Sequence, residues 1–238
     1  MICPRKIFYK SLKKKLKKAN TVLVFAIILV IATTLSYAAS KFIVLPLDIE
    51  SYYELQEEAN PSFSMVMLGV SALGDFPLSM LLTIIILAVL AFRRQWLEAI
   101  FILATTSSVL LAFTLKNVIQ RSRPFPISEN ATGLVQRINQ YSYPSGHVLF
   151  FVVFFGFLAY LAWIYLTGFH RIVVISLCAG LIILIGPSRV FLGAHWASDV
   201  VGSYLLGALW LFVLIFAHQW AVNLYCHDYN KNSQFDKS

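Results

Sequence analysis

Charged side chains are scarce in this sequence. Asp, Glu, Lys and Arg make up 13% of its 238 residues, whereas a soluble domain carries about a quarter. Hydrophobic residues make up 59%, and the mean hydropathy is +0.75. Because the apolar residues come in long blocks, this composition excludes a soluble domain with one large core. It predicts an all-α, polytopic membrane protein.

Cysteine is also rare, and internal repetition is absent. Cys3, Cys178 and Cys226 show neither a pairing pattern nor the spacing of metal ligands. The chain has no internal repeat, heptad pattern or low-complexity segment, and no composition break marks a second domain. We therefore expect one compact bundle without a disulfide framework.

Acidic residues are missing from the first 18 positions, which hold eight positive charges. A patch for anionic lipid or nucleic acid is one interpretation. An apolar segment follows directly, so we favour a topology signal that keeps residues 1–20 as a cytoplasmic tail and involves no nucleic acid. The same pattern resembles a signal peptide, with Ser36-Tyr37-Ala38 as a cleavage site. We favour an uncleaved anchor, because the apolar character continues to Leu45.

Six apolar segments are near the length that a bilayer requires. They cover about 21–44, 76–92, 96–116, 147–167, 171–187 and 197–218. We expect a six-transmembrane-helix bundle over residues 21–220, followed by a cytoplasmic tail at 221–238.

Lys and Arg in the short loops predict the orientation of these spans. With the N-terminus inside, Arg93-Arg94, His170-Arg171 and the C-terminus are also cytoplasmic, and an acidic first loop is external. We expect this loop to contain an amphipathic helix at about 49–72, interrupted by Pro61. Asp75, just before the second span, is interpreted as a helix cap.

The same topology brings three polar motifs to the external face. They are Lys116 to Pro124, Pro144-Ser145-Gly146-His147, and Ser188-Arg189 with His195 and Asp199. Basic residues are disfavoured on that face, so they predict a negatively charged ligand. Arg121 and Arg137 match no such spacing and are interpreted as snorkelling to the headgroups.

His195 and Asp199 are four residues apart, which makes them neighbours if both lie on one helix. The carboxylate of Asp199 would accept a hydrogen bond from one ring nitrogen and leave the other nitrogen free to attack. Taken alone, the pair is also typical of an ordinary bond at a helix end.

Ser145 is a natural helix cap, and Gly146 allows a ligand to approach the backbone. Free N–H groups at a helix start bind anions, phosphate above all, and His147 lies in that first turn. Lys116, Arg123 and Arg189 add cations that suit phosphate oxygens. Two histidines, an orienting carboxylate and three cations indicate phosphoryl transfer, with no cofactor and no carboxylate cluster for Mg²⁺.

Together the three motifs resemble those of the type 2 phosphatidic acid phosphatase (PAP2) family of lipid phosphate phosphatases. The resemblance covers Lys116 to Asp199 without a departure in the motif positions. It implies that His195 is the nucleophile, Asp199 its orienting partner and His147 the general acid. It further implies that Lys116, Arg123, Arg189 and the Ser145–Gly146 backbone hold the phosphate, and that no metal is required.

We therefore expect a multi-pass cell-membrane enzyme that hydrolyses a phosphorylated lipid at the periplasmic or extracellular face. Phosphatidylglycerophosphate, phosphatidic acid, diacylglycerol pyrophosphate and undecaprenyl pyrophosphate all fit this geometry. A lipid transporter or flippase is the alternative, disfavoured because the middle of each span lacks charge; Glu98 and His218 lie near the cytoplasmic ends. A haloperoxidase using vanadate is a further alternative, although the related soluble enzymes need no membrane bundle.

Overall fold

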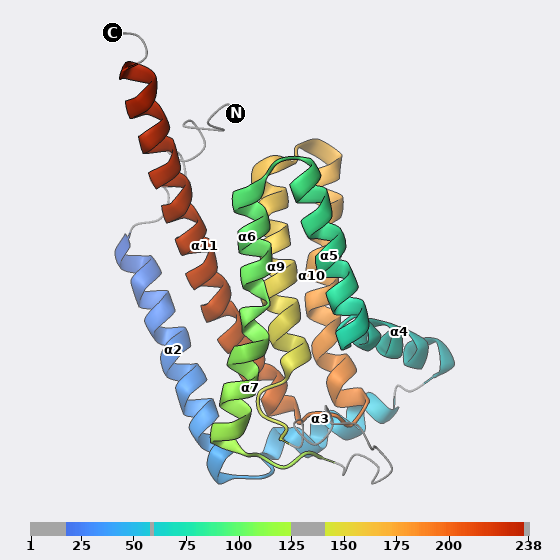
Figure 1. Ribbon diagram of the computed structural model, residues 1–238. Coiled ribbons are helices and arrows are strands. Elements are labelled where there is room, and N and C mark those ends of the chain that lie inside the picture. Colours follow the sequence, from blue (N-terminus) through green and yellow to red (C-terminus); the bar gives the residue numbers. More distant parts are fainter. Residues whose placement is uncertain (1–17, 58–59, 125–140, 236–238) are drawn as a thin grey trace.

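The computed structural model describes residues 18–57, 60–124 and 141–235, and the described secondary structure is helical apart from one isolated β-bridge. Residues 1–17 of the basic tail and Arg137 lie outside these ranges, so the predictions for them stay predictions. The helices gather into one bundle with shorter helices across one end (Figure 1).

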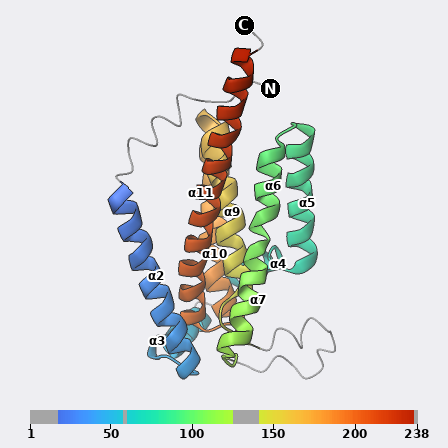
Figure 2. The same ribbon diagram turned by 60° about the vertical axis from the view of Figure 1, so that its left-hand side comes forward.

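The predicted six-span bundle is confirmed. Five stretches are long and apolar enough to cross a bilayer, and a bent pair makes a sixth. The five are α2 (Lys18–Lys41), α6 with α7 (Trp96–Thr105 and Ser107–Ile119), α9 (Gly146–Tyr165), α10 (Gly168–Phe191) and α11 (Ala197–Phe235). Figure 2 shows α6 and α7 following each other along one line, and α2 beside α11. Helix α11 continues well past residue 218, where the last span was expected to end.

The sixth span is the bent pair of α4 (Pro61–Ala72) and α5 (Phe76–Phe92), whose axes differ by 62°. The helix expected at 49–72 is present as two helices, α3 (Pro46–Glu57) and α4; because α4 is counted in the sixth span, only α3 remains as a separate external helix. A proline starts α4, and the side chain of Asn60 caps it by accepting a hydrogen bond from the Phe63 N–H. The predicted interruption at Pro61 is therefore confirmed, since a proline cannot continue a helix but begins one readily.

Different loops and helix ends lie at the two ends of the bundle. The α5–α6 turn, the α9–α10 turn and the end of α11 lie at the top of Figure 1. The ends of α2, α7 and α10, the starts of α9 and α11, and helix α3 lie at the bottom. All three sequence motifs therefore fall at one end, as the loop charges predicted.

Helix α9 forms the centre of the bundle. It packs against α6, α7, α10 and α11, and 67% of its apolar window is buried, compared with at most 33% in the other single spans. Phe151, Phe154 and Phe157 are fully buried along it. The site at its first turn thus begins a rigid element, which limits how far a side chain there can move.

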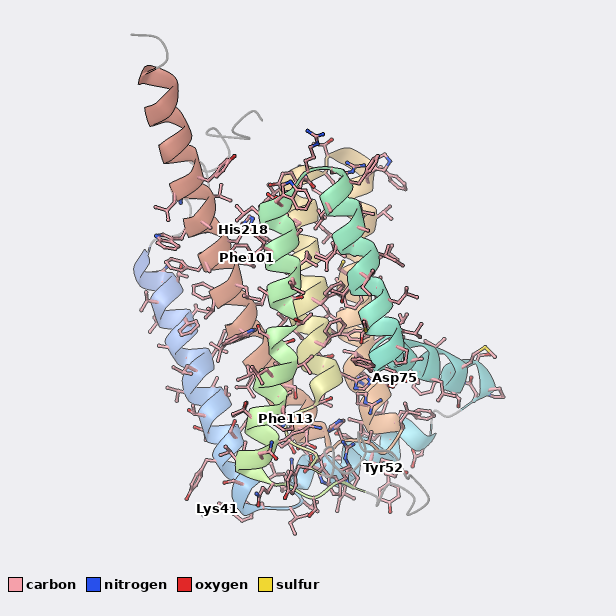
Figure 3. The ribbon with its side chains drawn as sticks, viewed as in Figure 1. Lys41, Tyr52, Asp75, Phe101, Phe113 and His218 are labelled. Atoms are coloured by element: carbon pink, nitrogen blue, oxygen red, sulfur yellow. The ribbon has the colours of Figure 1, made fainter. Side chains whose placement is uncertain are left out.

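A second polar cluster lies toward the opposite end, where Figure 3 labels His218 and Phe101. His218 is buried, with Nδ1 3.1 Å from the Tyr160 hydroxyl and Nε2 4.0 Å from Glu98 Oε1. The Tyr165 hydroxyl donates to the same Glu98 oxygen. This cluster links α6, α9 and α11, because a buried carboxylate needs partners in an apolar bundle.

Close packing of α9 on α11 depends on Gly207. A Cβ atom there would lie 2.9 Å from Cβ of Val152, so the two helices would have to separate. We expect Gly207→Ala to destabilise the protein by about 1–3 kcal/mol, the usual effect of overpacking. Thermal unfolding in detergent would measure it.

Gly180→Ala is the matched control, because a Cβ there meets nothing within 4 Å. Alanine favours helix over glycine by roughly 1 kcal/mol, so this variant should unfold at the same or a higher temperature. A Gly207→Ala protein as stable as the control would contradict the packing argument.

Candidate active site

The site lies where the end of α7, the start of α9 and the turn between α10 and α11 meet. The backbone of Ser142 donates to the Arg121 carbonyl at 2.8 Å, and Ser122 and Tyr141 form an isolated β-bridge. The indole N–H of Trp196 donates to the Ser122 carbonyl at 3.0 Å. These bonds tie the three motifs to one another, although they are distant in the sequence.

His195 is almost completely buried, at 2% exposure, in the turn that precedes α11. Its Nδ1 lies 3.8 Å from Asp199 Oδ2. The two residues do not lie on one helix, the condition on which the sequence made them neighbours, because α11 begins only at Ala197. The two side chains still face each other because the turn folds back, with the His195 N–H donating to the Arg189 carbonyl at 3.3 Å.

The environment of His195 keeps its imidazole neutral. Burial lowers the pKa of His195 well below its ordinary value, and the positive charges of Arg123, Arg189 and Lys116 lower it further. A neutral imidazole has a free lone pair on one nitrogen, so His195 is chemically able to act as a nucleophile.

Asp199 has a second partner that was not expected. Arg121 Nη1 lies 2.5 Å from Asp199 Oδ1, and Arg121 Nη2 lies 2.7 Å from Asp48 Oδ2. The interpretation of Arg121 as a snorkelling side chain is therefore wrong, since that side chain is 0% exposed. The guanidinium is buried because two carboxylates compensate its charge.

The start of α9 differs from the prediction in its hydrogen bonds. Ser145 occupies the N-cap position, but its side chain makes no capping bond. Its N–H donates to Ser203 Oγ at 2.7 Å, and Ser203 Oγ donates to the Asp199 carbonyl at 2.6 Å. The expectation that this N–H is presented to a phosphate is thus wrong for Ser145. Gly146, the first residue of α9, keeps the predicted position.

His147 also has a carboxylate partner. Its Nε2 lies 3.0 Å from Oδ1 of Asp75, which is at the bend between α4 and α5 (Figure 3). Asp75 does occupy the N-cap position of α5, but its side chain makes no capping bond. Its interpretation as a helix cap is therefore wrong in function, and His195 is not the one histidine paired with a carboxylate.

Lys116, Arg123 and Arg189 surround the two histidines. Lys116 lies in the last turn of α7 at 5% exposure, and Arg189 in the last turn of α10. Arg123 Nη1 donates to the Ala194 carbonyl at 2.8 Å, and Arg189 Nη1 donates to Ser71 Oγ. Their positive charges act on His195 and, for Lys116 and Arg189, on His147. The structure thus brings all the predicted site residues together.

Three buried polar atoms here have no hydrogen-bond partner among the described residues: Ser145 Oγ, Arg189 Nε and His195 Nδ1. Buried polar atoms are nearly always paired, so this concentration marks a place built for a polar ligand. The surrounding cations favour an anion, and a phosphoryl group supplies several acceptor oxygens.

Comparison with known proteins agrees with this chemistry. Residues 95–223 match the PAP2 superfamily. The chain is 31% identical over 157 residues to phosphatidylglycerophosphatase B of Bacillus subtilis, covering 65% of this chain and 74% of that protein. The chain belongs to the PAP2 superfamily.

Two further relatives support the same family. The chain is 28% identical over 120 residues to an undecaprenyl-diphosphatase of Sulfolobus acidocaldarius, which covers 49% of this chain and 52% of that protein. The crystal structure of the transmembrane PAP2-type phosphatidylglycerolphosphate phosphatase from Bacillus subtilis superposes with a TM-score of 0.67 at 26% identity. That match covers 80% of this chain and 93% of the crystallised one. This chain is thus a multi-pass PAP2 lipid phosphatase.

Sequence reasoning missed the roles of Asp48, Asp75 and Arg121. Arg121 is two positions before Arg123, and its proximity to a motif could have raised its priority. Asp48 and Asp75 carry no local pattern, since their partners are 73 and 72 positions away. Only the packing of α3 and of the α4–α5 bend against the motifs identifies these carboxylates.

Gly74 allows the α4–α5 bend to lie against His147. A Cβ at this position would lie 2.3 Å from His147 Cδ2, so the ring would have to move away. Because misplacing a reacting group by about 1 Å can cost 10²-fold in rate, we expect Gly74→Ala to lower the phosphatase kcat by that order. Phosphate release from a lipid phosphate in detergent would measure it.

The control is Gly69→Ala in α4, the helix that precedes this bend, where a Cβ meets nothing within 4 Å. This variant should keep wild-type kcat. Equal kcat values for the two alanine variants would mean that the bend does not position His147.

Proposed function

We propose that this protein hydrolyses a membrane lipid phosphate through a phosphohistidine intermediate on His195. The observation that carries the proposal is the buried, neutral His195 beside Asp199, surrounded by the cations of Lys116, Arg123 and Arg189. A second histidine, His147, lies close enough for its charge to act on His195. These are the parts that phosphoryl transfer through a nucleophile and a general acid requires.

In the first step, the His195 Nε2 lone pair attacks phosphorus and the bond from phosphorus to the lipid oxygen breaks. The leaving oxygen takes that electron pair and a proton from His147. Asp199 compensates the positive charge that grows on the His195 ring, while Lys116, Arg123 and Arg189 stabilise the phosphoryl oxygens. Bond formation and bond cleavage are in line across the phosphorus.

In the second step, water attacks the phosphohistidine. His147 takes a proton from the water, the P–N bond breaks, and its electron pair returns to His195. Inorganic phosphate leaves, and both histidines regain their starting protonation. We expect this cycle to need no metal ion, because cationic side chains surround the phosphoryl position.

The names of the relatives guide the choice of lipid. Phosphatidylglycerophosphate is the first candidate, since the phosphatidylglycerophosphatase B relative is matched over most of its length. Undecaprenyl diphosphate is the second, because an undecaprenyl-diphosphatase is also similar. A panel of lipid monophosphates and diphosphates, scored by kcat/KM, would separate the two.

The external face of the membrane is the proposed place of reaction. Arg93 and Arg94 lie in the α5–α6 turn and Arg171 in the first turn of α10, at the end of the bundle opposite the site. Since positive residues favour the cytoplasmic side, this distribution supports an external site and cytoplasmic termini. The acyl or prenyl chain would remain in the bilayer.

His195→Ala should abolish phosphate release, lowering kcat by at least about 10³-fold, because no nucleophile remains. Wild-type protein should release phosphate in EDTA and form an acid-labile, base-stable phosphoenzyme that the variant lacks. His170→Ala is the matched control: His170 is exposed at the opposite end and should behave as wild type. Full activity of His195→Ala would sink the mechanism, and lipid movement without phosphate release would favour the transporter alternative.

His147→Asn should show a loss that depends on the leaving group. A general acid contributes about 10²–10⁴-fold, and it matters most when the leaving oxygen is a poorly stabilised alkoxide. We expect a large drop in kcat with phosphatidylglycerophosphate and a much smaller one with p-nitrophenyl phosphate, whose leaving group needs no proton. Equal losses on both substrates would exclude His147 as the proton donor.

A further inference from the structure

Asp48 is a fully buried carboxylate in a helix that otherwise lies across the end of the bundle. Its side chain is 0% exposed, although its neighbours Leu47, Ile49 and Glu50 are exposed. Burying a carboxylate is unfavourable unless it is fully paired. An acidic external loop explains the presence of a carboxylate at this position but does not explain why Asp48 is buried.

The two oxygens of Asp48 have three partners. Oδ2 accepts from the Leu45 N–H at 2.8 Å and faces Arg121 Nη2 at 2.7 Å. Oδ1 accepts from the Ser198 N–H at 2.8 Å, in the first turn of α11. Asp48 thus attaches α3 to the residue that immediately precedes Asp199.

Arg121 lies between two carboxylates, and its bonds leave it little freedom. Besides Asp48 and Asp199, it donates from Nε to the Ile43 carbonyl at 3.1 Å and from Nη1 to Ser198 Oγ at 2.8 Å. Asp48, Arg121 and Asp199 are all buried, and together they carry a net charge of −1. With Asp48 neutral, the same group would carry no net charge.

The two carboxylate oxygens of Asp199 have different partners. Oδ1 faces Arg121, whereas Oδ2 accepts from the Trp196 N–H at 3.0 Å and faces His195 Nδ1 at 3.8 Å. His195 is therefore stabilised only by the part of the Asp199 negative charge that is not neutralised by Arg121. Asp48, the other carboxylate paired with Arg121, supplies part of the compensation of the Arg121 charge.

We propose that Asp48 is a positioning residue for the phosphotransfer reaction: by sharing the charge of Arg121, it leaves more of the negative charge of Asp199 for His195 and keeps Asp199 correctly oriented. The inference rests on the proposed function, because it assigns Asp48 a task in the step where His195 becomes positively charged. Asp48 does not contact the reacting atoms. Its effect is carried by charge balance and by its bond to the Ser198 N–H.

The balance of charge among Asp48, Arg121 and Asp199 predicts how kcat and KM change when Asp48 is neutralised. Without the negative charge of Asp48, Arg121 is neutralised by Asp199 alone. Less of the negative charge of Asp199 then stabilises the positive charge that grows on the His195 ring as the P–N bond forms. Asp48→Asn should lower kcat about 10- to 100-fold, by analogy with the residues that orient the ligands of a catalytic metal through a hydrogen bond. KM should change less than threefold or so, because Lys116, Arg123 and Arg189 still bind the phosphate.

Changing Arg121 as well reverses the sign of the effect. Arg121→Gln leaves two adjacent buried carboxylates with a net charge of −2, which disfavours the folded, active arrangement. Adding Asp48→Asn to that variant restores the net charge of −1 on Asp199 alone. The same substitution should thus lower kcat in wild type and raise it in Arg121→Gln.

The test measures kcat and KM for phosphate release from phosphatidylglycerophosphate in detergent for wild type, Asp48→Asn, Arg121→Gln and the double variant. Glu50→Gln is the control, as it removes an exposed negative charge from the same helix. Size-exclusion chromatography and thermal unfolding establish that each protein is folded. His195→Ala reports separately on the proposed function.

A wild-type kcat for Asp48→Asn, a loss equal to that of Glu50→Gln, or losses that multiply in the double variant would each overturn the inference. A loss confined to KM would also overturn it. If Asp48→Asn fails to fold, kcat of Arg121→Gln is compared with kcat of the double variant. A higher kcat in the double variant supports the inference, and an equal or lower one overturns it. If wild type and His195→Ala are equally active, the proposed function has failed instead.

Discussion

A buried cation shared by two carboxylates is the interaction on which the active end of this protein depends. Arg121 pairs with Asp48 and Asp199 in a region where all three side chains are removed from water. Removing one member of such a group typically lowers the stability of the fold by about 3–5 kcal/mol, because a charge is left unpaired in apolar surroundings. The group therefore fixes the relative positions of α3, the end of α7 and the start of α11.

The residues proposed to be catalytic are positioned by that arrangement. Asp199 is placed by Arg121 and by the Trp196 N–H, and His195 is held against it by the turn between α10 and α11. On the other side, His147 is held by Asp75 and by the close approach of Gly74. Each histidine thus has its own carboxylate, one buried and one 59% exposed.

This difference in exposure agrees with the proposed division of work. A nucleophile must keep its lone pair, and His195 is the more deeply buried histidine, with a side chain 2% exposed against 21% for His147. The positive charges of Lys116 and Arg189 act on both histidines and do not separate the two roles. A proton donor must exchange protons with water between steps, and His147 with Asp75 is the more accessible pair. A carboxylate partner does not distinguish the two histidines, because Asp75 lies beside His147 as Asp199 lies beside His195. The proposed role of His147 as the acid rests on which histidine is sealed from water.

The sequence by itself determined the fold class, the grouping of three motifs at one end and the family, because hydropathy, loop charge and short motifs are local properties of the chain. It could not assign Asp75, Asp48 or Arg121, which it interpreted as a helix cap, a loop charge and a snorkelling side chain. Only the tertiary structure decided these roles. The physical reason is that the value of a charge depends on what surrounds it, and their partners come from helices more than 70 residues away in the chain.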